Sequence, residues 1–308
     1  MATKKAVSTA KKSVKKPTVA AKKPAPTKAK TTKPEAAAVA AVTKITEKSK
    51  DLASDRMVRI VSAEIVGTFV LTLVALLTFQ ETAPLYVGLT VMALVLGIGA
   101  VSGAHINPAV TFGLWSMRKL KTIMVPFYWA AQFIGAMGAV LLINAVAKDT
   151  IKLSFDKFLS FNGGLFAVEL VGTAVFMFIL AAAFSRKDLS TYGRAFGIGV
   201  AIIIGSLVSG SLLSNIQSAD IKAYQAKAAA TEETVEIPRA VYVKSATLSP
   251  AVALATTEKT DSQLTGQAAS DTEKQYSRLG VEVILATLVG AALGGNLYLL
   301  LSGRKEQA

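Results

Sequence analysis

The sequence predicts an all-α membrane protein with six transmembrane helices and two re-entrant half-helices, arranged as an inverted repeat. Three observations support this prediction. Hydrophobic residues make up 52% of the 308 residues and the mean hydropathy is +0.47, which is too apolar for an ordinary soluble domain. Six apolar stretches are long enough to cross a bilayer. Landmarks of the first half return in the second half at similar spacing.

The six apolar stretches lie near residues 60–80, 84–101, 123–146, 164–184, 194–211 and 279–302. A helix needs about 20 residues to cross the hydrocarbon layer, so all six qualify as transmembrane helices. Two further apolar segments, 107–115 and 250–255, are too short to cross. We expect these two segments to enter the membrane only part of the way.

Residues 1–56 differ in composition from the rest of the chain. They contain 15 of the 34 Lys and Arg residues and no aromatic residue. Such a segment buries too little apolar surface to offset its ordering entropy, so we predict a disordered basic tail. Its partner is anionic lipid or nucleic acid. Lipid is favoured because the tail continues directly into a membrane helix, and each basic residue near the surface contributes about 1 kcal/mol.

Basic residues between the helices predict the orientation of the chain. Clusters of Lys and Arg fall on one side of the predicted bundle, in the tail, at 117–121, at 186–194 and at 304–305. Basic loops stay in the cytoplasm. We therefore expect both termini to be cytoplasmic in a multi-pass protein of the cell membrane, plasma or inner.

The internal repeat divides residues 57–303 into repeat one, 57–146, and repeat two, 164–303. The sequence Glu64-Ile-Val-Gly-Thr in the first copy corresponds to Glu169-Leu-Val-Gly-Thr in the second. Each copy has three spanning helices, so the second is inserted upside down and the functional site is expected near the midplane. A polar insertion at about 211–245 interrupts repeat two. We expect it outside the cell, helical at 223–233 and extended at 235–243, either capping the pore or merely tolerated.

Two short motifs predict helices that begin inside the apolar region. Asn107-Pro108-Ala109 combines a good N-cap residue with proline at the first helical position. Ser249-Pro250-Ala251 has the same form. A helix start at membrane depth is tolerated only where it faces protein or water. Two such starts that meet would repel cations and leave room for neutral molecules.

The segment 102–111, Ser-Gly-Ala-His-Ile-Asn-Pro-Ala-Val-Thr, makes the chain resemble the aquaporin and glycerol-facilitator (major intrinsic protein) family. The resemblance covers about residues 58–302 outside the insertion. It implies a six-helix pore in each subunit of a homotetramer, which passes water or small neutral solutes. Glu64 and Glu169 match the buried glutamates of the family, which would accept hydrogen bonds from the re-entrant loops. His105 is expected to brace the first of these loops.

The chain departs from the family pattern at two positions of the second motif. Serine replaces asparagine at Ser249, and valine replaces the usual arginine at Val252. The resemblance implies that the constriction of the pore lies at the positions that match the family's, which are Val87, Ser206, Ala246 and Val252. We expect a wide, uncharged selectivity filter that admits neutral solutes larger than water. The alternative is a divergent member of the family that conducts poorly.

Composition excludes several other functions. The chain has no cysteine and one histidine, so disulfides and multi-histidine metal sites are excluded. We find no catalytic set, and we expect neither an enzyme nor a cofactor. The remaining alternatives are an ion-coupled transporter, which would show more titratable residues in its helices, and a non-conducting scaffold whose tail binds lipid or nucleic acid.

Three glycine pairs at four-residue spacing predict close helix packing rather than a ligand site. They are Gly99/Gly103, Gly193/Gly197 and Gly290/Gly294.

Overall fold

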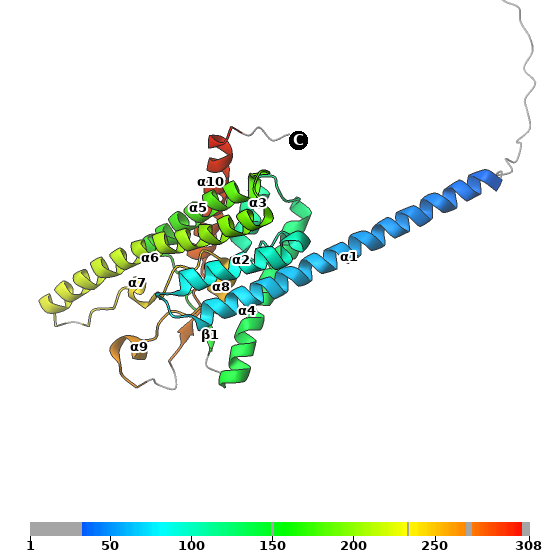
Figure 1. Cartoon of the computed structure of the whole chain (residues 1–308). Helices are drawn as coiled ribbons and strands as arrows, with labels where there is room; N and C mark the ends of the chain where they lie inside the picture. Colours follow the sequence, from blue (N-terminus) through cyan, green and yellow to red (C-terminus); the bar gives the residue numbers. More distant parts are fainter. Residues whose placement is uncertain (1–32, 149–150, 233, 269–272, 304–308) are drawn as a thin grey trace, which may run out of the picture. The chain divides into compact units, whose positions relative to one another are not determined.

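The computed structural model describes residues 33–148, 151–232, 234–268 and 273–303, and for residues 33–53 it describes the helical backbone alone. The chain divides into two compact units, Met1–Asp51 and Leu52–Ala308. All the residues that form the site belong to the second unit, and Figure 1 shows the elements that carry them.

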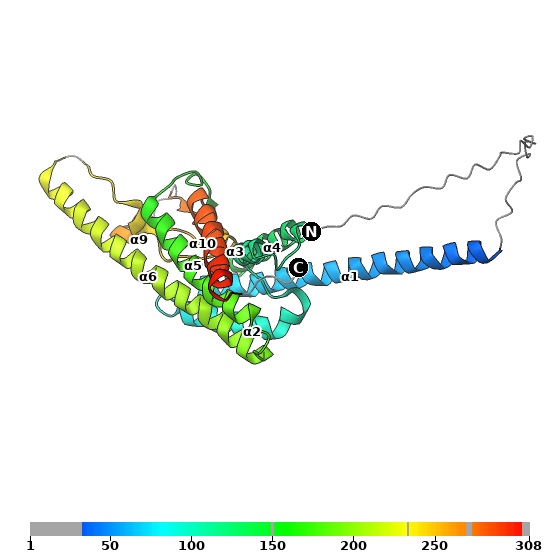
Figure 2. The same ribbon diagram turned by 90° about the horizontal axis from the view of Figure 1, so that it is seen from above.

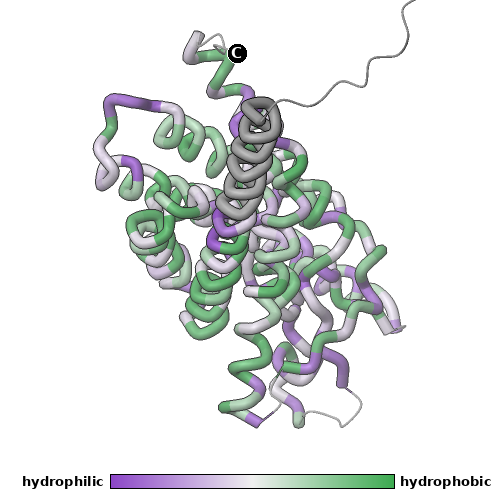
Figure 3. The backbone as a smooth tube through the Cα atoms, turned by 90° about the vertical axis from the view of Figure 1, so that its right-hand side faces the viewer, coloured by the Kyte–Doolittle hydropathy of each residue, from purple (hydrophilic) through white to green (hydrophobic). Residues whose placement is uncertain are grey.

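Six helices of the described chain are long and apolar enough to cross a membrane, as the sequence predicts. They are α1 (Lys33–Leu77, with its candidate span at Ser54–Leu77), α2 (Ala83–Ser102), α4 (Val125–Ala147, preceded by the 3-10 turn η1, Thr122–Met124), α5 (Gly163–Ser185), α6 (Thr191–Ala230) and α10 (Val281–Leu301). Green, hydrophobic residues predominate along these helices in Figure 3, whereas purple, hydrophilic residues gather in the connecting segments. The chain is therefore a multi-pass membrane protein.

The remaining elements are short. Two half-helices, α3 (Pro108–Ser116) and α8 (Pro250–Ala255), begin at the two Pro-Ala motifs. The loops also contain α7 (Arg239–Tyr242), α9 (Asp261–Thr265) and two parallel strands, β1 (Leu153–Ser154) and β2 (Gln275–Tyr276). The strands pair in the register Leu153 to Gln275 and Ser154 to Tyr276. They thereby join the loop before α5 to the loop before α10.

The spanning helices pack around the two half-helices. Helix α5 packs against α6 and α10, and α2 packs against α6, as Figures 1 and 2 show. Half-helix α3 contacts α4, α5, α8 and α10, and α8 also contacts α4. The two half-helices therefore meet inside the bundle, and apolar residues such as Val110, Leu114, Met177 and Ile202 form the core around them.

Helix α1 begins earlier than the sequence led us to expect. Residues 33–56, which we expected to be disordered, form the first part of α1, whereas residues 1–32 lie outside the described residues. The reason is local composition. Residues 35–51 are rich in Ala, Lys and Glu and contain neither Gly nor Pro, so their composition favours a helix.

The insertion also differs from its expected structure. Helix α6 does not end near residue 211 but continues to Ala230, so residues 223–230 of the expected separate helix belong to α6. The expected extended segment at 235–243 contains the short helix α7 instead. No Gly or Pro lies between Gly210 and Pro238, so no helix-breaking residue stops the spanning helix near residue 211. At about 1.5 Å per residue, α6 is roughly twice as long as the bilayer core requires.

Close helix packing depends on both glycines of the predicted pair Gly290/Gly294 and on Gly197 of the pair Gly193/Gly197, where an added Cβ would lie 2.9 Å from that of Ala183. A Cβ atom at Gly290 would lie 2.5 Å from the carbonyl oxygen of Leu170, and one at Gly294 would lie 2.1 Å from that of Ala174. Helix α10 therefore contacts α5 backbone to backbone. The pair Gly99/Gly103 has another role, because Gly103 is the left-handed C-cap of α2, with φ of 89°.

We predict that Gly294→Ala lowers the free energy of unfolding by about 1–3 kcal/mol, because the added methyl group forces α10 away from α5. Thermal unfolding of the purified protein in detergent measures this change. The matched control is Gly97→Ala in α2, where nothing lies within 4 Å of the added Cβ. Equal melting temperatures for the two variants would contradict the close contact.

Candidate pore

The first half-helix begins as its sequence predicts. Asn107 has extended backbone geometry, and its side-chain oxygen accepts a hydrogen bond of 2.8 Å from the backbone N–H of Ala109. Pro108 occupies the first helical position, where its missing N–H costs nothing. Pro108 and Ala109 are both buried. Helix α3 therefore starts with its N-terminus capped inside the protein.

Glu64 of α1 holds the loop that precedes α3. This fully buried carboxylate accepts hydrogen bonds from the backbone N–H groups of His105 (3.0 Å) and Ile106 (2.7 Å). It also accepts hydrogen bonds from Ser102 Oγ and Gln132 Nε2. The loop needs this support because Ile106 has φ of 45°, in the left-handed region that L-residues rarely adopt.

His105 packs beside the same loop and is also buried. Its ring lies 4.4 Å, centroid to centroid, from the ring of Tyr128, and its Nδ1 is 3.2 Å from Thr111 Oγ1. Tyr128 in turn donates a hydrogen bond to the carbonyl oxygen of Ser102. His105 thus connects the loop to α3 and α4. No group of three or more potential metal ligands occurs among the described residues.

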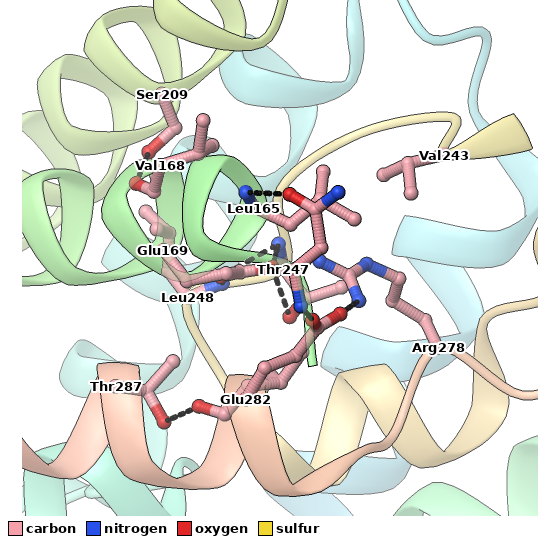
Figure 4. Close-up of polar contacts among 12 residues, drawn as sticks. Leu165, Val168, Glu169, Ser209, Val243, Thr247, Leu248, Arg278, Glu282 and Thr287 are labelled. Atoms are coloured by element: carbon pink, nitrogen blue, oxygen red, sulfur yellow. Dashed lines mark hydrogen bonds and ion pairs between the residues drawn. The ribbon is translucent and has the colours of Figure 1, made fainter. Parts of the chain in front are cut away.

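The second half-helix, α8, begins in the same way, with a side-chain N-cap and a buried glutamate that holds the preceding loop. Ser249 caps α8, and its Oγ accepts a weak hydrogen bond of 3.4 Å from Val252 N–H. Glu169 of α5 accepts hydrogen bonds from the backbone N–H groups of Thr247 (3.0 Å) and Leu248 (2.9 Å). Leu248 has φ of 52°, so here too a buried glutamate holds a left-handed residue before a helix start. Figure 4 shows Glu169 beside these two residues.

One hydrogen bond joins the two loops directly. Asn107 Nδ2 donates to the carbonyl oxygen of Leu248 at 2.9 Å, although the two residues are 141 positions apart in the sequence. Pro250 and Ala251 are buried next to this contact, and α3 touches α8. The amino-terminal ends of both half-helices therefore face each other inside the bundle.

A cavity of about 470 Å³ runs along this junction, and we call it the pore cavity. Asn107 and Ser249 line it, as do the four residues predicted for the selectivity filter, Val87, Ser206, Ala246 and Val252. The filter residues come from α2, α6, the loop before α8 and α8 itself. None of the four carries a charge, and Val252 is 8% exposed. The part of the pore cavity that these four residues line is therefore free of charged side chains among them.

A chain of buried ion pairs supports the second loop, and our reading of the sequence missed it. Arg278, which is 2% exposed, lies 2.6 Å from Glu282 and 3.8 Å from Glu169. Arg239 from the insertion pairs with Glu282 (3.1 Å) and with Glu258 (2.9 Å). Figure 4 shows Arg278 reaching toward Glu282. These pairs connect the insertion and the loop before α10 to the carboxylate that holds Leu248.

The only sequence signal for this network was weak. Arg278 and Glu282 stand four residues apart at the start of the last apolar stretch, a spacing that also fits an ordinary exposed pair on a helix surface. Arg239 and Glu258 lie 19 residues apart, and only the tertiary fold brings them together.

Lys244 is a further charged residue that the sequence analysis did not single out. It lines the pore cavity and also a neighbouring side cavity of about 320 Å³. Its Nζ donates a hydrogen bond of 3.1 Å to Thr257 Oγ1. Burial lowers the pKa of Lys244, and the nearby Lys259 lowers it further.

This geometry defines a membrane protein of six spanning helices whose two re-entrant half-helices meet at a cavity. The family model described as "Major intrinsic protein" matches residues 51–217, more than half of the chain. The chain therefore belongs to the major intrinsic protein family, whose members are channels and not enzymes.

Individual relatives agree with this assignment. The chain is 36% identical over 125 residues to Aquaporin NIP2-3 of Zea mays, which corresponds to 40% of this chain and 41% of that protein. It is 29% identical over 178 residues to Aquaporin Z of Photorhabdus laumondii, covering 50% of this chain and 77% of that protein. The chain thus spans about two fifths of the length of the maize relative.

A solved structure shows the same fold. The X-ray structure of the aquaglyceroporin from Plasmodium falciparum matches with a TM-score of 0.50 and 19% sequence identity. The match covers 79% of this chain and 95% of that one. At this identity the likeness establishes the fold alone.

We predict that Arg278→Met lowers the free energy of unfolding by about 3 kcal/mol, because the buried carboxylates of Glu282 and Glu169 would lose the positive charge that Arg278 supplies. Thermal unfolding in detergent measures the change. Lys274→Met is the matched control, since Lys274 forms an exposed ion pair with Asp156 and should leave the melting temperature almost unchanged. An Arg278 variant as stable as this control would show that the buried network contributes nothing.

Proposed function

We propose that the protein is a passive channel for water and small neutral solutes, and that its wide, uncharged filter admits solutes larger than water. The observation that carries this proposal is the pore cavity. It passes the meeting point of the two half-helices, where Asn107 supplies an amide and Ser249 a hydroxyl. Polar groups at a helix junction in an apolar channel offer hydrogen bonds to an uncharged molecule.

The predicted filter supports the preference for larger neutral solutes. Val252 stands where the family usually has arginine, and Val87, Ser206 and Ala246 are small or medium-sized. Without a long cationic side chain the constriction is wider and less polar. The exclusion of neutral solutes by size is then weaker. An ion would still lose hydrating water in the apolar pore, and this loss makes its passage costly.

The remaining parts of the proposal concern assembly and location. We propose a homotetramer in a plasma or inner cell membrane, with both termini in the cytoplasm. Two basic clusters favour that orientation: one at 117–121, between α2 and α4, and one at 186–194, which spans the link from α5 to α6 and the first turn of α6. The basic N-terminal segment is proposed to contact anionic lipid, with nucleic acid as the alternative partner.

The test is a stopped-flow swelling assay of liposomes that contain the purified chain, with separate gradients of glycerol, urea and water. We expect faster glycerol and urea entry than in empty liposomes. Equal rates in loaded and empty liposomes would refute a conducting channel and favour the non-conducting scaffold.

We further predict opposite effects of two substitutions at Val252. Val252→Arg should lower glycerol permeability on the order of tenfold by narrowing the filter, whereas Val252→Ala should raise it. Val289→Ala is the matched control, because Val289 is 42% exposed on the outside of α10. Val289→Ala should leave permeability unchanged. A Val252→Arg variant as permeable as the unmodified protein would place the filter elsewhere.

A further inference from the structure

Lys244 lies in a segment whose backbone is fixed at both ends. On one side, Gln217 of α6 donates hydrogen bonds to the carbonyl oxygens of Ala240 (2.9 Å) and Val243 (2.8 Å). On the other side, Glu169 holds the backbone N–H groups of Thr247 and Leu248. The position of Lys244 beside the pore is therefore set by contacts from α5 and α6.

The charge of Lys244 stands out within the pore cavity. Among the described residues that line this cavity, Glu81 and Lys244 are the two with an acidic or a basic side chain that is charged at neutral pH. Glu81 is exposed, whereas Lys244 is half-buried. Partial burial reduces the screening of a charge by water, so Lys244 acts more strongly on the pore than Glu81 does.

The neighbours of Lys244 do not neutralise it. Its hydrogen-bond partner, Thr257 Oγ1, carries no charge. Lys259 lies close enough to affect it, but it carries a like charge and therefore does not neutralise Lys244. Glu258 also lines the side cavity, but its carboxylate already pairs with Arg239 and Lys157. The positive charge of Lys244 therefore remains at the lining that the pore cavity shares with the side cavity.

We propose that Lys244 is a specificity-determining residue, which supplies the positive charge that the filter lacks at Val252 and so keeps small cations out of the pore. It stands two residues before Ala246 and lines the same cavity as Val252. The charge lies to the side of the filter instead of across it. Cations are thus repelled without the narrowing that an arginine at Val252 would cause, and this inference rests on the proposed channel function.

The test compares two substitutions of Lys244 in liposomes that contain the full chain. Lys244→Gln removes the charge but keeps a donor for Thr257, whereas Lys244→Arg keeps the charge. Glycerol entry is measured by swelling and sodium entry by a fluorescent indicator inside the liposomes. We expect the ratio of sodium to glycerol flux to rise about tenfold in Lys244→Gln and to stay at the unmodified level in Lys244→Arg.

Lys259→Gln is the matched control. This variant removes the charge of Lys259, which is absent from the described lining of either cavity. Its ratio of sodium to glycerol flux should therefore stay at the unmodified level. The inference is overturned if Lys244→Gln excludes sodium as well as the unmodified chain does, or if Lys259→Gln admits as much sodium. Failure of the channel itself is distinct, because the unmodified protein would then show no glycerol entry above empty liposomes.

Discussion

The fold depends on how the backbone polar groups of two broken helices are satisfied inside a membrane. Each loop that leads to a half-helix has N–H groups with no helical partner, and no lipid can accept their hydrogen bonds. Glu64 and Glu169 accept them instead, with N···O distances of 2.7–3.3 Å. A carboxylate at membrane depth is costly, but here it satisfies two backbone donors and holds a left-handed residue. The half-helices, and therefore the pore cavity, follow from these contacts.

The two repeats meet this requirement by different means. Around Glu64 the other donors are uncharged, namely Ser102 and Gln132. Around Glu169 the chain adds Arg278, which pairs with Glu282, and this carboxylate pairs with Arg239 of the insertion. The insertion therefore contributes, through Arg239, to the ion pairs that hold the second loop. This connection gives a physical reason why an irregular inserted segment coexists with an ordered half-helix.

Much of the site could be predicted from the sequence because its residues lie in local patterns. Asn107-Pro108 and Ser249-Pro250 specify helix starts within a few residues, and the repeat spacing relates them to Glu64 and Glu169. The Arg278 network and the position of Lys244 could not be predicted in this way. Their partners are distant in sequence, and a charged residue in a polar loop gives no sign of whether the fold will bury it. The end of α6 was missed for a related reason, since hydropathy marks the bilayer but not the end of a helix.

The sequence by itself determined the membrane class, the six spans, the inverted repeat and the two helix starts. These features arise from apolar length, from proline and N-cap chemistry, and from repetition, all of which are properties of short segments. Only the tertiary structure decided which side chains share the pore cavity, which charges pair, and that Asn107 binds the backbone at Leu248. Those contacts join residues that are far apart in the sequence, as Asn107 and Leu248 are at 141 positions, and their geometry depends on how the helices pack rather than on any local pattern.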